Sequence, residues 1–401
     1  MTVWVRSLTL DDFRSYPHVE CRFDPGVNVL LGRNGQGKTN VLEAIGYVAT
    51  QRSHRAASDA LLVRRETERA LIACEMDSEG QTVSVDIAII PGRANKARVN
   101  RVNVPRASGA LGHLRTVIFA PEDLALVKGD PSARRDFLDD VLVQMHPRLH
   151  GVIAEFDRAL RQRNSLLKSA RERRMSPDSV ETSLNVWDEH VSASGGHLVA
   201  ARVALVEALD EPFREAYARI ADTPEVLGGA TRLAYRASWL GERGERGELG
   251  ELGELGPALD DAPLVTADDV TNRLRQALVA ARPIDRARGV TTIGPQRDEL
   301  DIRLDGSPAR GFASHGESWS LALAMRLAAY RLFVDLGPGP VLLLDDVFAE
   351  LDTRRRAALL AAIEDADQVI VTAAVEEDVP GLAEARILDV ASGAIASRAR
   401  A

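Results

Sequence analysis

Apolar and polar residues alternate along the first part of the chain in a way that is typical of β-strands. Residues Val3 to Leu10 alternate, and residues Gln81 to Ile90 place four β-branched apolar side chains on one face. Residues Val27 to Leu31 form a short apolar run that ends in a glycine-rich turn. The pattern therefore predicts that the first 120 or so residues are mostly strands.

The middle of the chain has a different pattern. From Pro131 to about Ile220, acids, arginines and leucines follow the spacing of surface helices, and residues Asp268 to Ala281 predict another helix. Strand patterns return after residue 291, where Val341 to Leu344 and Gln368 to Thr372 are apolar runs typical of buried parallel strands. Two strand-rich ends around a helical middle predict an α/β fold with a discontinuous domain and a helical insertion.

We place the domain boundaries where the pattern changes. Residues 1–125 are predicted to form the first part of the discontinuous domain, 126–285 the inserted helical arm, and 286–401 the second part. Within the arm, residues 241–256 repeat every third position, as Gly-Glu-Arg and then Gly-Glu-Leu. Glycine at this spacing disfavours both helix and strand, so we expect a solvated acidic insertion; a specific binding segment is the alternative.

Composition excludes several classes of protein. The content of 45% apolar and 27% charged residues argues against a wholly disordered chain, and no 18-residue apolar run that would span a membrane is present. The two cysteines, Cys21 and Cys74, lack metal-ligand spacing and fit a reducing, cytoplasmic location. A net charge of −9 excludes a uniformly basic DNA-coating protein but leaves room for a local basic surface.

The turn after residue 31 matches the phosphate-binding loop pattern of glycine, four residues, glycine, lysine and threonine. Glycines let backbone N–H groups surround phosphate oxygens, and the following helix adds the positive end of its dipole. Lys38 supplies a charge for the phosphates and is also a catalytic candidate, while the Thr39 hydroxyl suits Mg²⁺. The candidate ATP-binding residues here are Gly32, Arg33, Asn34, Gly35, Gln36, Gly37, Lys38, Thr39 and Asn40.

Two carboxylates follow the apolar strand that begins near residue 341. Asp345 suits the coordination sphere of Mg²⁺, and Asp346 stands where a catalytic base would polarise the attacking water. An ordinary acidic turn at a strand end is the alternative for this pair alone. The next residues, Ala349 to Asp352, match the turn that follows this strand in ABC-type ATPases.

A third motif lies between the first two. Ser314 precedes a predicted helix from Trp319 to Val334, and its hydroxyl and the free N–H groups can bind an anion. We interpret Ser314, Gly316 and Glu317 as the signature motif of an ABC-type ATPase, although a plain helix cap would look similar. In that fold the signature motif caps the nucleotide of a second subunit. We therefore expect a homodimer with two ATP molecules between its chains.

Several further motifs resemble the RecF family of bacterial DNA replication and repair proteins, and the resemblance covers most of the chain. The motifs that carry it are Asp12-Phe13-Arg14-Ser15-Tyr16, Ser53-His54-Arg55, Ala120-Pro121-Glu122-Asp123-Leu124, Arg134-Arg135-Asp136-Phe137-Leu138-Asp139 and Gly294-Pro295-Gln296-Arg297-Asp298-Glu299-Leu300. His315, Glu317 and Gln296 depart from the family pattern. The resemblance implies an ABC-type P-loop ATPase head, discontinuous in sequence, with an inserted helical arm.

The resemblance also implies a function. A RecF-like protein is expected to dimerise on ATP and Mg²⁺, to bind gapped or junction DNA, single-stranded or double-stranded, and to hydrolyse ATP weakly with stimulation by DNA. It is expected to work with RecO and RecR in loading a RecA filament during recombinational repair, replication restart and the SOS response. A transporter or translation-associated ABC ATPase, and an interaction protein with a relict nucleotide site, are the alternatives.

Two clusters of cations are candidates for DNA binding, with a solvated helix face as the alternative. The members of the first are Arg158, Arg161, Arg163, Lys168, Arg171, Arg173 and Arg174, and those of the second, expected on a hairpin, are Arg93, Lys96, Arg98, Arg101 and Arg106. No base-reading signal accompanies them, so we expect contacts to phosphates.

Overall fold

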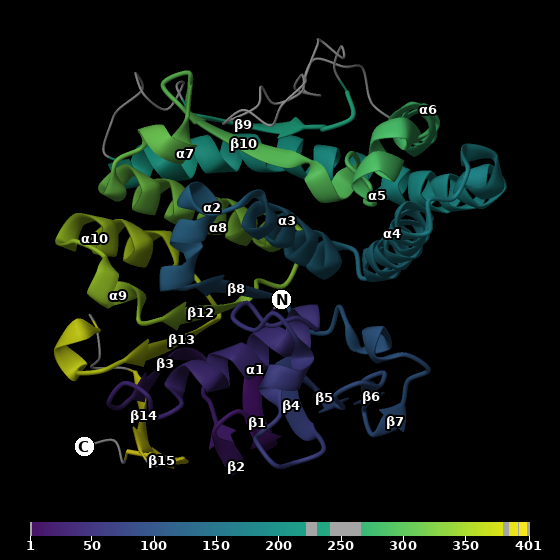
Figure 1. The fold of residues 1–401 in the computed structure, drawn as a ribbon. Helices are drawn as coiled ribbons and strands as arrows, with labels where there is room; N and C mark the ends of the chain where they lie inside the picture. Colours follow the sequence, from purple (N-terminus) through teal and green to yellow (C-terminus); the bar gives the residue numbers. More distant parts are fainter. Residues whose placement is uncertain (1, 222–230, 241–265, 380–384, 392, 399–401) are drawn as a thin grey trace.

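The computed structural model describes residues 2–221, 231–240, 266–379, 385–391 and 393–398. Most strands and helix α1 (Lys38–Thr50) lie in the lower half of Figure 1, and the long helices lie in the upper half with the strands labelled β9 and β10. The repeat at 241–256 lies outside the described residues. Among the described helices, none is long and apolar enough to cross a membrane.

The central sheet has the strand order β15-β14-β3-β13-β12-β8, and all neighbours are parallel except the edge strand β15. Its strands are β3 (Gly26–Leu31), β8 (Thr116–Phe119), β12 (Val341–Asp345), β13 (Gln368–Ala373), β14 (Arg386–Ala391) and β15 (Ala394–Ser397). Strands from both ends of the sequence alternate in it, which confirms that this part of the fold is discontinuous.

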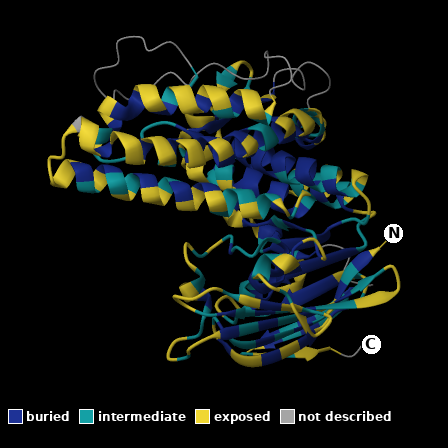
Figure 2. Cartoon of the chain, turned by 90° about the vertical axis from the view of Figure 1, so that its right-hand side faces the viewer, coloured by how far each residue is buried: buried dark blue, intermediate teal, exposed yellow. Residues whose placement is uncertain are grey.

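The two faces of the central sheet bury different cores. On β12, Leu342 and Leu344 pack into a cluster with the helices, whereas Val341 and Leu343 pack into a second cluster with α1 and the N-terminal strands. This division follows from the two-residue period of a strand, and both faces are buried, as the continuous apolar run predicts. Figure 2 shows the buried sheet between the outer layers.

A second, antiparallel sheet covers α1 from the other side. Its strands, in the order β2-β1-β4-β5-β6-β7, are β1 (Val3–Phe13), β2 (Tyr16–Arg22), β4 (Ala70–Ser78), β5 (Gln81–Ile89), β6 (Lys96–Val99) and β7 (Val102–Asn103). This sheet confirms the strand predictions near residues 3–10 and 81–90, and β3 of the central sheet confirms the one at 27–31. The expected hairpin in the basic region is formed by β6 and β7.

The helical layer contains α2 (Leu124–Lys128), α3 (Pro131–Met145), α4 (Leu149–Glu172), α5 (Pro177–Ala221), α6 (Ala267–Arg288), α7 (Ala309–Phe312), α8 (His315–Asp335), α9 (Val347–Glu350) and α10 (Thr353–Ala362). A small sheet of β9 (Arg232–Arg236), β10 (Glu299–Leu304) and β11 (Ser307–Pro308) lies against α5. One buried cluster runs from β12 through α8 to α5 and α6, so these helices share a core with the sheet. The three domain boundaries remain a prediction.

Candidate nucleotide site and basic surfaces

The phosphate-binding loop follows β3 and leads into α1, as predicted. Gly35 and Gly37 have φ values of 80° and 106°, which residues with a side chain rarely adopt. The side chain of Lys38 is folded back over the loop, where its Nζ donates hydrogen bonds to the carbonyl oxygen of Gly32 (2.7 Å) and to Oδ1 of Asn34 (3.3 Å). Lys38 is only 3% exposed, so its charge is held inside the loop.

The acidic end of β12 meets this loop. Thr39 Oγ1 donates a hydrogen bond to Asp345 Oδ1 at 2.8 Å, and Thr372 Oγ1 on β13 contacts the same oxygen at 2.8 Å and Asp346 Oδ1 at 3.3 Å. The carboxyl ends of β3, β13 and β12 share one edge of the sheet, because these strands are parallel neighbours. The structure thus brings Lys38, Thr39, Asp345 and Asp346 to one edge.

The oxygens of Thr39 and Asp345 suit Mg²⁺, which prefers hydroxyl and carboxylate ligands beside phosphate. Burial raises the pKa of Asp345; hydrogen bonds from Thr372 and Thr39 lower it, while the negative charges of Asp346 and Glu122 raise it further. Such a site favours a cation, because a divalent ion would offset the cost of the buried carboxylate. Thr39 and Asp345 could hold Mg²⁺ between this edge and the phosphates.

The Asp12–Tyr16 motif supports the loop, which the sequence analysis did not foresee. Tyr16 packs against Gly37 so closely that a Cβ atom there would lie 2.7 Å from the Tyr16 hydroxyl. Asn40 Nδ2 also donates a hydrogen bond of 2.9 Å to Ser15 Oγ. Gly37 therefore needs to be glycine for two reasons, its φ angle and this contact.

The same motif anchors α1 through a buried carboxylate. Arg14 donates to both oxygens of Glu43, at 2.8 and 2.5 Å, and Ser53 Oγ lies 2.5 Å from Glu43 Oε1. Burial alone would raise the pKa of Glu43, but the hydrogen bonds from Arg14 and Ser53 outweigh it and keep this pKa below its usual value. Two motifs that resemble the RecF pattern, at residues 12–16 and 53–55, thus serve to fix the helix that follows the phosphate loop.

The predicted signature motif opens α8. Ser314 Oγ accepts a hydrogen bond from the N–H of Glu317 (3.2 Å), and Glu317 Oε2 accepts one from the N–H of Ser314 (2.8 Å), which confirms the predicted cap and extends it to a capping box. The helix begins at His315, four residues earlier than expected. Ser314 is exposed, and Phe312 just before it is 75% exposed. The hydrogen bonds from Ser314 lower the pKa of Glu317.

Two other motifs of the resemblance, at residues 134–139 and 294–300, lie against each other in the helical layer. Arg134 donates to both carboxylate oxygens of Glu299 at 2.7 and 2.8 Å, and Asp139 binds Arg202 in the same bidentate way. Arg202 Nη1 also donates to the carbonyl oxygen of Pro295 at 2.9 Å. The motifs at residues 134–139 and 294–300 are therefore interlocked by buried ion pairs.

One member of the first basic cluster is not available to DNA. Arg163 is fully buried, where its guanidinium binds Asp188 (2.6 Å) and Asp285 (2.7 Å). Its inclusion among the phosphate contacts was wrong, because sequence spacing alone does not reveal which arginines of a helix face inward. The exposed members include Arg171, whose Nη1 donates to the carbonyl oxygen of Arg288 (2.9 Å), so the end of α6 adds cations to this surface.

The second cluster lies around the hairpin of β6 and β7, with its turn at Asn100 and Arg101. All five of its cations, Arg93, Lys96, Arg98, Arg101 and Arg106, are exposed. The hairpin and the far end of α4 lie towards the same side of the molecule in Figure 1. This arrangement leaves two separate basic surfaces that a nucleic acid backbone could contact.

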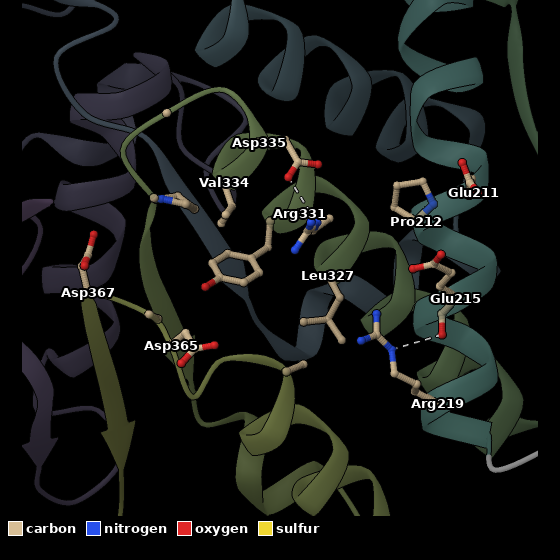
Figure 3. A pocket seen from close by; sticks show the side chains of 16 residues that line it. Glu211, Pro212, Glu215, Arg219, Leu327, Arg331, Val334, Asp335, Asp365 and Asp367 are labelled. Atoms are coloured by element: carbon tan, nitrogen blue, oxygen red, sulfur yellow. Dashed lines mark hydrogen bonds and ion pairs between the residues drawn. The ribbon is translucent and has the colours of Figure 1, made fainter. Parts of the chain in front are cut away.

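A groove of about 710 Å³ lies elsewhere, between α5, α8 and the segments before β12 and β13 (Figure 3). Its rim carries Glu211, Glu215, Asp335, Asp365 and Asp367. It lies at the amino ends of β12 and β13, whereas the phosphate loop lies at the carboxyl ends of the sheet. It is therefore not part of the candidate nucleotide site.

Comparison with known proteins gives the family. Residues 4–391 match the family model described as RecF/RecN/SMC N terminal domain. The chain is 45% identical to the DNA replication and repair protein RecF of Paenarthrobacter aurescens, over 98% of this chain and 99% of that protein. It is 49% identical to RecF of Frankia alni, over 93% of this chain and 94% of that one.

Solved structures agree on the fold. The structure described as recombination mediator protein RecF-ATPrS in the RecFOR pathway is similar with a TM-score of 0.81, at 24% identity and 99% coverage of both chains. A RecF-ATP structure of the same pathway gives a TM-score of 0.78 at 24% identity, again over 99% of both chains. The α/β architecture is thus that of the RecF head, an ABC-type ATPase fold. From its motifs, its fold and its full-length relatives, this chain belongs to the RecF family of DNA replication and repair proteins.

Proposed function

We propose that this protein is an ATP-dependent DNA-binding protein of recombinational repair and replication restart. The observation that carries this proposal is the contact of Thr39 with Asp345, which joins the phosphate loop to the acidic strand beside the buried Lys38. Such a site suits Mg²⁺-ATP. Related structures described as RecF with ATP support the same choice of nucleotide.

In the proposed mechanism two copies enclose two ATP molecules. The loop at residues 32–40 and the acids Asp345 and Asp346 of one chain contact each triphosphate, and Ser314, Gly316 and Glu317 of the other chain cap it. The exposure of Ser314 and its place at the positive end of the α8 dipole support this role. ATP would then favour the dimer because it binds the dimer better than the monomer.

Hydrolysis of ATP is proposed to return the dimer to monomers. Asp346 N–H donates to Thr372 Oγ1 at 2.8 Å, which fixes the backbone of the proposed base in a left-handed conformation with φ of 49°. Asp346 would polarise the attacking water, and Lys38 would stabilise charge on the transferred phosphoryl group. We expect slow turnover that DNA stimulates.

The basic surfaces are proposed to hold DNA by its phosphates. Lys168, Arg171, Arg173 and Arg174 at the end of α4 are all exposed, as are the cations of the β6–β7 hairpin. Gapped or junction DNA, RecO, RecR and a RecA filament are the proposed partners. The relatives' place in the RecFOR pathway supports this assignment.

DNA stimulation of ATP hydrolysis tests the proposal against the alternatives. Phosphate release would be measured with gapped duplex, with single strands and without DNA, at low and physiological salt. We expect turnover to rise with gapped DNA and to lose this stimulation at high salt. A rate that no DNA changes at any salt concentration would favour a transporter-like or relict ATPase and contradict the proposal.

A further inference from the structure

Arg355 lies between the start of α8 and the turn that follows the acidic strand. Its Nε donates a hydrogen bond of 2.9 Å to Ser320 Oγ on α8, and its guanidinium forms an ion pair with Asp352. Asp352 in turn caps α10, because its Oδ1 accepts a hydrogen bond of 2.8 Å from the N–H of Arg355. One side chain therefore connects two elements that are separate in sequence.

The guanidinium of Arg355 lies very close to Gly316 of the signature motif. A Cβ atom on Gly316 would lie 2.7 Å from Nη2 of Arg355, nearer than real side chains approach. Gly316 is not among the residues with positive φ, so its backbone does not itself require glycine. A side chain at this signature position would therefore require the guanidinium to shift from its contacts with Ser320 and Asp352.

The guanidinium is also enclosed. The side chain of Arg355 is 24% exposed, and it lines a cavity of about 250 Å³ together with Glu317, Ser320 and Asp352. Tyr217 of α5 lines the same cavity. Burial raises the pKa of Tyr217 to about 12, the negative charge of Glu317 adds to this rise, and the positive charge of Arg355 opposes it. These contacts on several sides hold the side chain of Arg355 in one position between α8 and α10.

We infer that Arg355 is a positioning residue that sets the start of the signature helix relative to the acidic strand. The inference rests on the proposed ATP-bound dimer. In that dimer Asp346 acts on the ATP of its own chain, whereas Ser314 and Gly316 cap the ATP of the other chain. Arg355 joins Ser320, four residues after Gly316, to Asp352, six residues after Asp346. It would therefore couple the two nucleotide sites.

A purely electrostatic role is the competing explanation. A positive charge beside the start of α8 could instead attract the phosphates of the other chain's ATP. Lysine keeps the charge but cannot reproduce the planar fork that holds Ser320 and Asp352 at once. Arg355→Lys therefore separates the two roles: positioning predicts a defect like that of Arg355→Ala, and charge predicts nearly normal behaviour.

The first test uses the nucleotide-free protein. Hydrogen exchange of the backbone amides of residues 317–320 would be measured in the wild type, Arg355→Ala, Arg355→Lys and the control Arg331→Ala. Arg331 is a suitable control because it lies on the same helix and is ion-paired with Asp335. We expect exchange about tenfold faster in both Arg355 variants and unchanged in the control. Unchanged exchange in Arg355→Ala would overturn the positioning role, whether or not the protein dimerises.

The second test asks whether Gly316 and Arg355 act as one unit. The dimer dissociation constant with ATP would be measured for Gly316→Ala, Arg355→Ala and the double variant, with ATP affinity of the monomer as a control. We expect each of the three variants to weaken dimerisation by about tenfold. The double variant should be no worse than either single variant, because each single change already disrupts the same contact. Losses that multiply, or a loss confined to Gly316→Ala, would overturn the inference. A wild type that ATP does not dimerise would instead contradict the proposed function.

Discussion

The hydroxyl of Thr39 donates a hydrogen bond of 2.8 Å to the carboxylate of Asp345, although 306 positions separate them in the chain. The strands before these residues, β3 and β12, are separated in the sheet by β13 alone. Thr372 on β13 contacts both Asp345 and Asp346 and completes the link. The candidate site therefore exists only after the two ends of the chain have paired.

Lys38→Ala is expected to abolish ATP binding and ATP-driven dimerisation together. The ammonium group is buried against the loop oxygens, and no other described residue supplies a charge at that position in the motif. Calorimetry with ATP would measure the first effect, and sedimentation the second. Lys128→Ala, on an exposed lysine of α2, is the matched control. Unchanged nucleotide affinity in Lys38→Ala would refute the phosphate assignment.

Asp346→Asn should bind ATP normally but hydrolyse it about 100-fold more slowly or worse, since the amide cannot accept a proton from water. Dimers should then accumulate in the presence of ATP. Single-turnover phosphate release and light scattering would measure the two effects. Asp268→Asn, an exposed acid in the first turn of α6, should behave as the wild type. Normal turnover in Asp346→Asn would assign the base to another group.

Asp345→Asn should raise the melting temperature of the nucleotide-free protein at neutral pH. The pKa of Asp345 is raised, so the folded protein binds its proton more tightly than the unfolded chain, and the ionised carboxylate costs stability above that pKa. This gain in melting temperature should shrink as the pH falls, because the carboxyl group of Asp345 in the wild type then becomes protonated and neutral, like the amide of the variant. Melting curves between pH 5 and 8 in a metal chelator would measure this difference.

The same variant should lose the effect of Mg²⁺ on ATP affinity, because an amide oxygen is a weaker ligand than a carboxylate. Lower stability of Asp345→Asn at every pH would contradict the assignment of a destabilising buried charge. Full retention of the Mg²⁺ effect would contradict the assignment of the ligand.

Reversing the charges of Arg171, Arg173 and Arg174 to glutamate should weaken DNA binding and flatten its salt dependence. Loss of three phosphate contacts predicts a slope of log K against log salt that is lower by about 2 to 3. Fluorescence anisotropy with gapped duplex at several salt concentrations would measure the slope. An unchanged slope would contradict the role of these three arginines and would indicate that DNA contacts the β6–β7 hairpin instead.

Arg163→Met should act on stability and leave the salt slope unchanged. The substitution would leave Asp188 and Asp285 buried without this cation, which typically costs about 3 to 5 kcal/mol. Urea unfolding would measure the loss, and the anisotropy series would show whether DNA binding is affected. A variant with normal stability and a flatter salt slope would indicate that Arg163 does contact DNA.

The sequence predicted the elements whose pattern is set by the backbone. Apolar runs predicted β3, β12 and β13, because a buried parallel strand has apolar neighbours on both faces. The glycine-lysine-threonine spacing predicted the tight loop between β3 and α1, because its positive φ angles favour glycine. The capping serine at 314 was predicted for the same local reason.

Contacts between distant elements could not be predicted in this way. Arg163 points inward because α5 and α6 pack against that side of α4, and the sequence of α4 alone does not show where those helices pack. The contact of Tyr16 with Gly37 and that of Arg355 with Gly316 each join a glycine to a side chain from another element. In both cases the sequence showed the glycine in a motif, but it did not show which side chain lies against that glycine.

Sedimentation velocity with and without ATP tests the central claim most directly, with the wild type compared with Ser314→Arg. The account predicts that ATP converts the wild type from monomer to dimer, and that Ser314→Arg stays monomeric while it still binds ATP. Since Ser314 is exposed, the monomer has room for the arginine, and the ATP affinity of the variant monomer checks that the lost cap of α8 leaves the nucleotide site intact. An ATP-dependent dimer of Ser314→Arg, or a wild type that ATP leaves monomeric, would contradict the account.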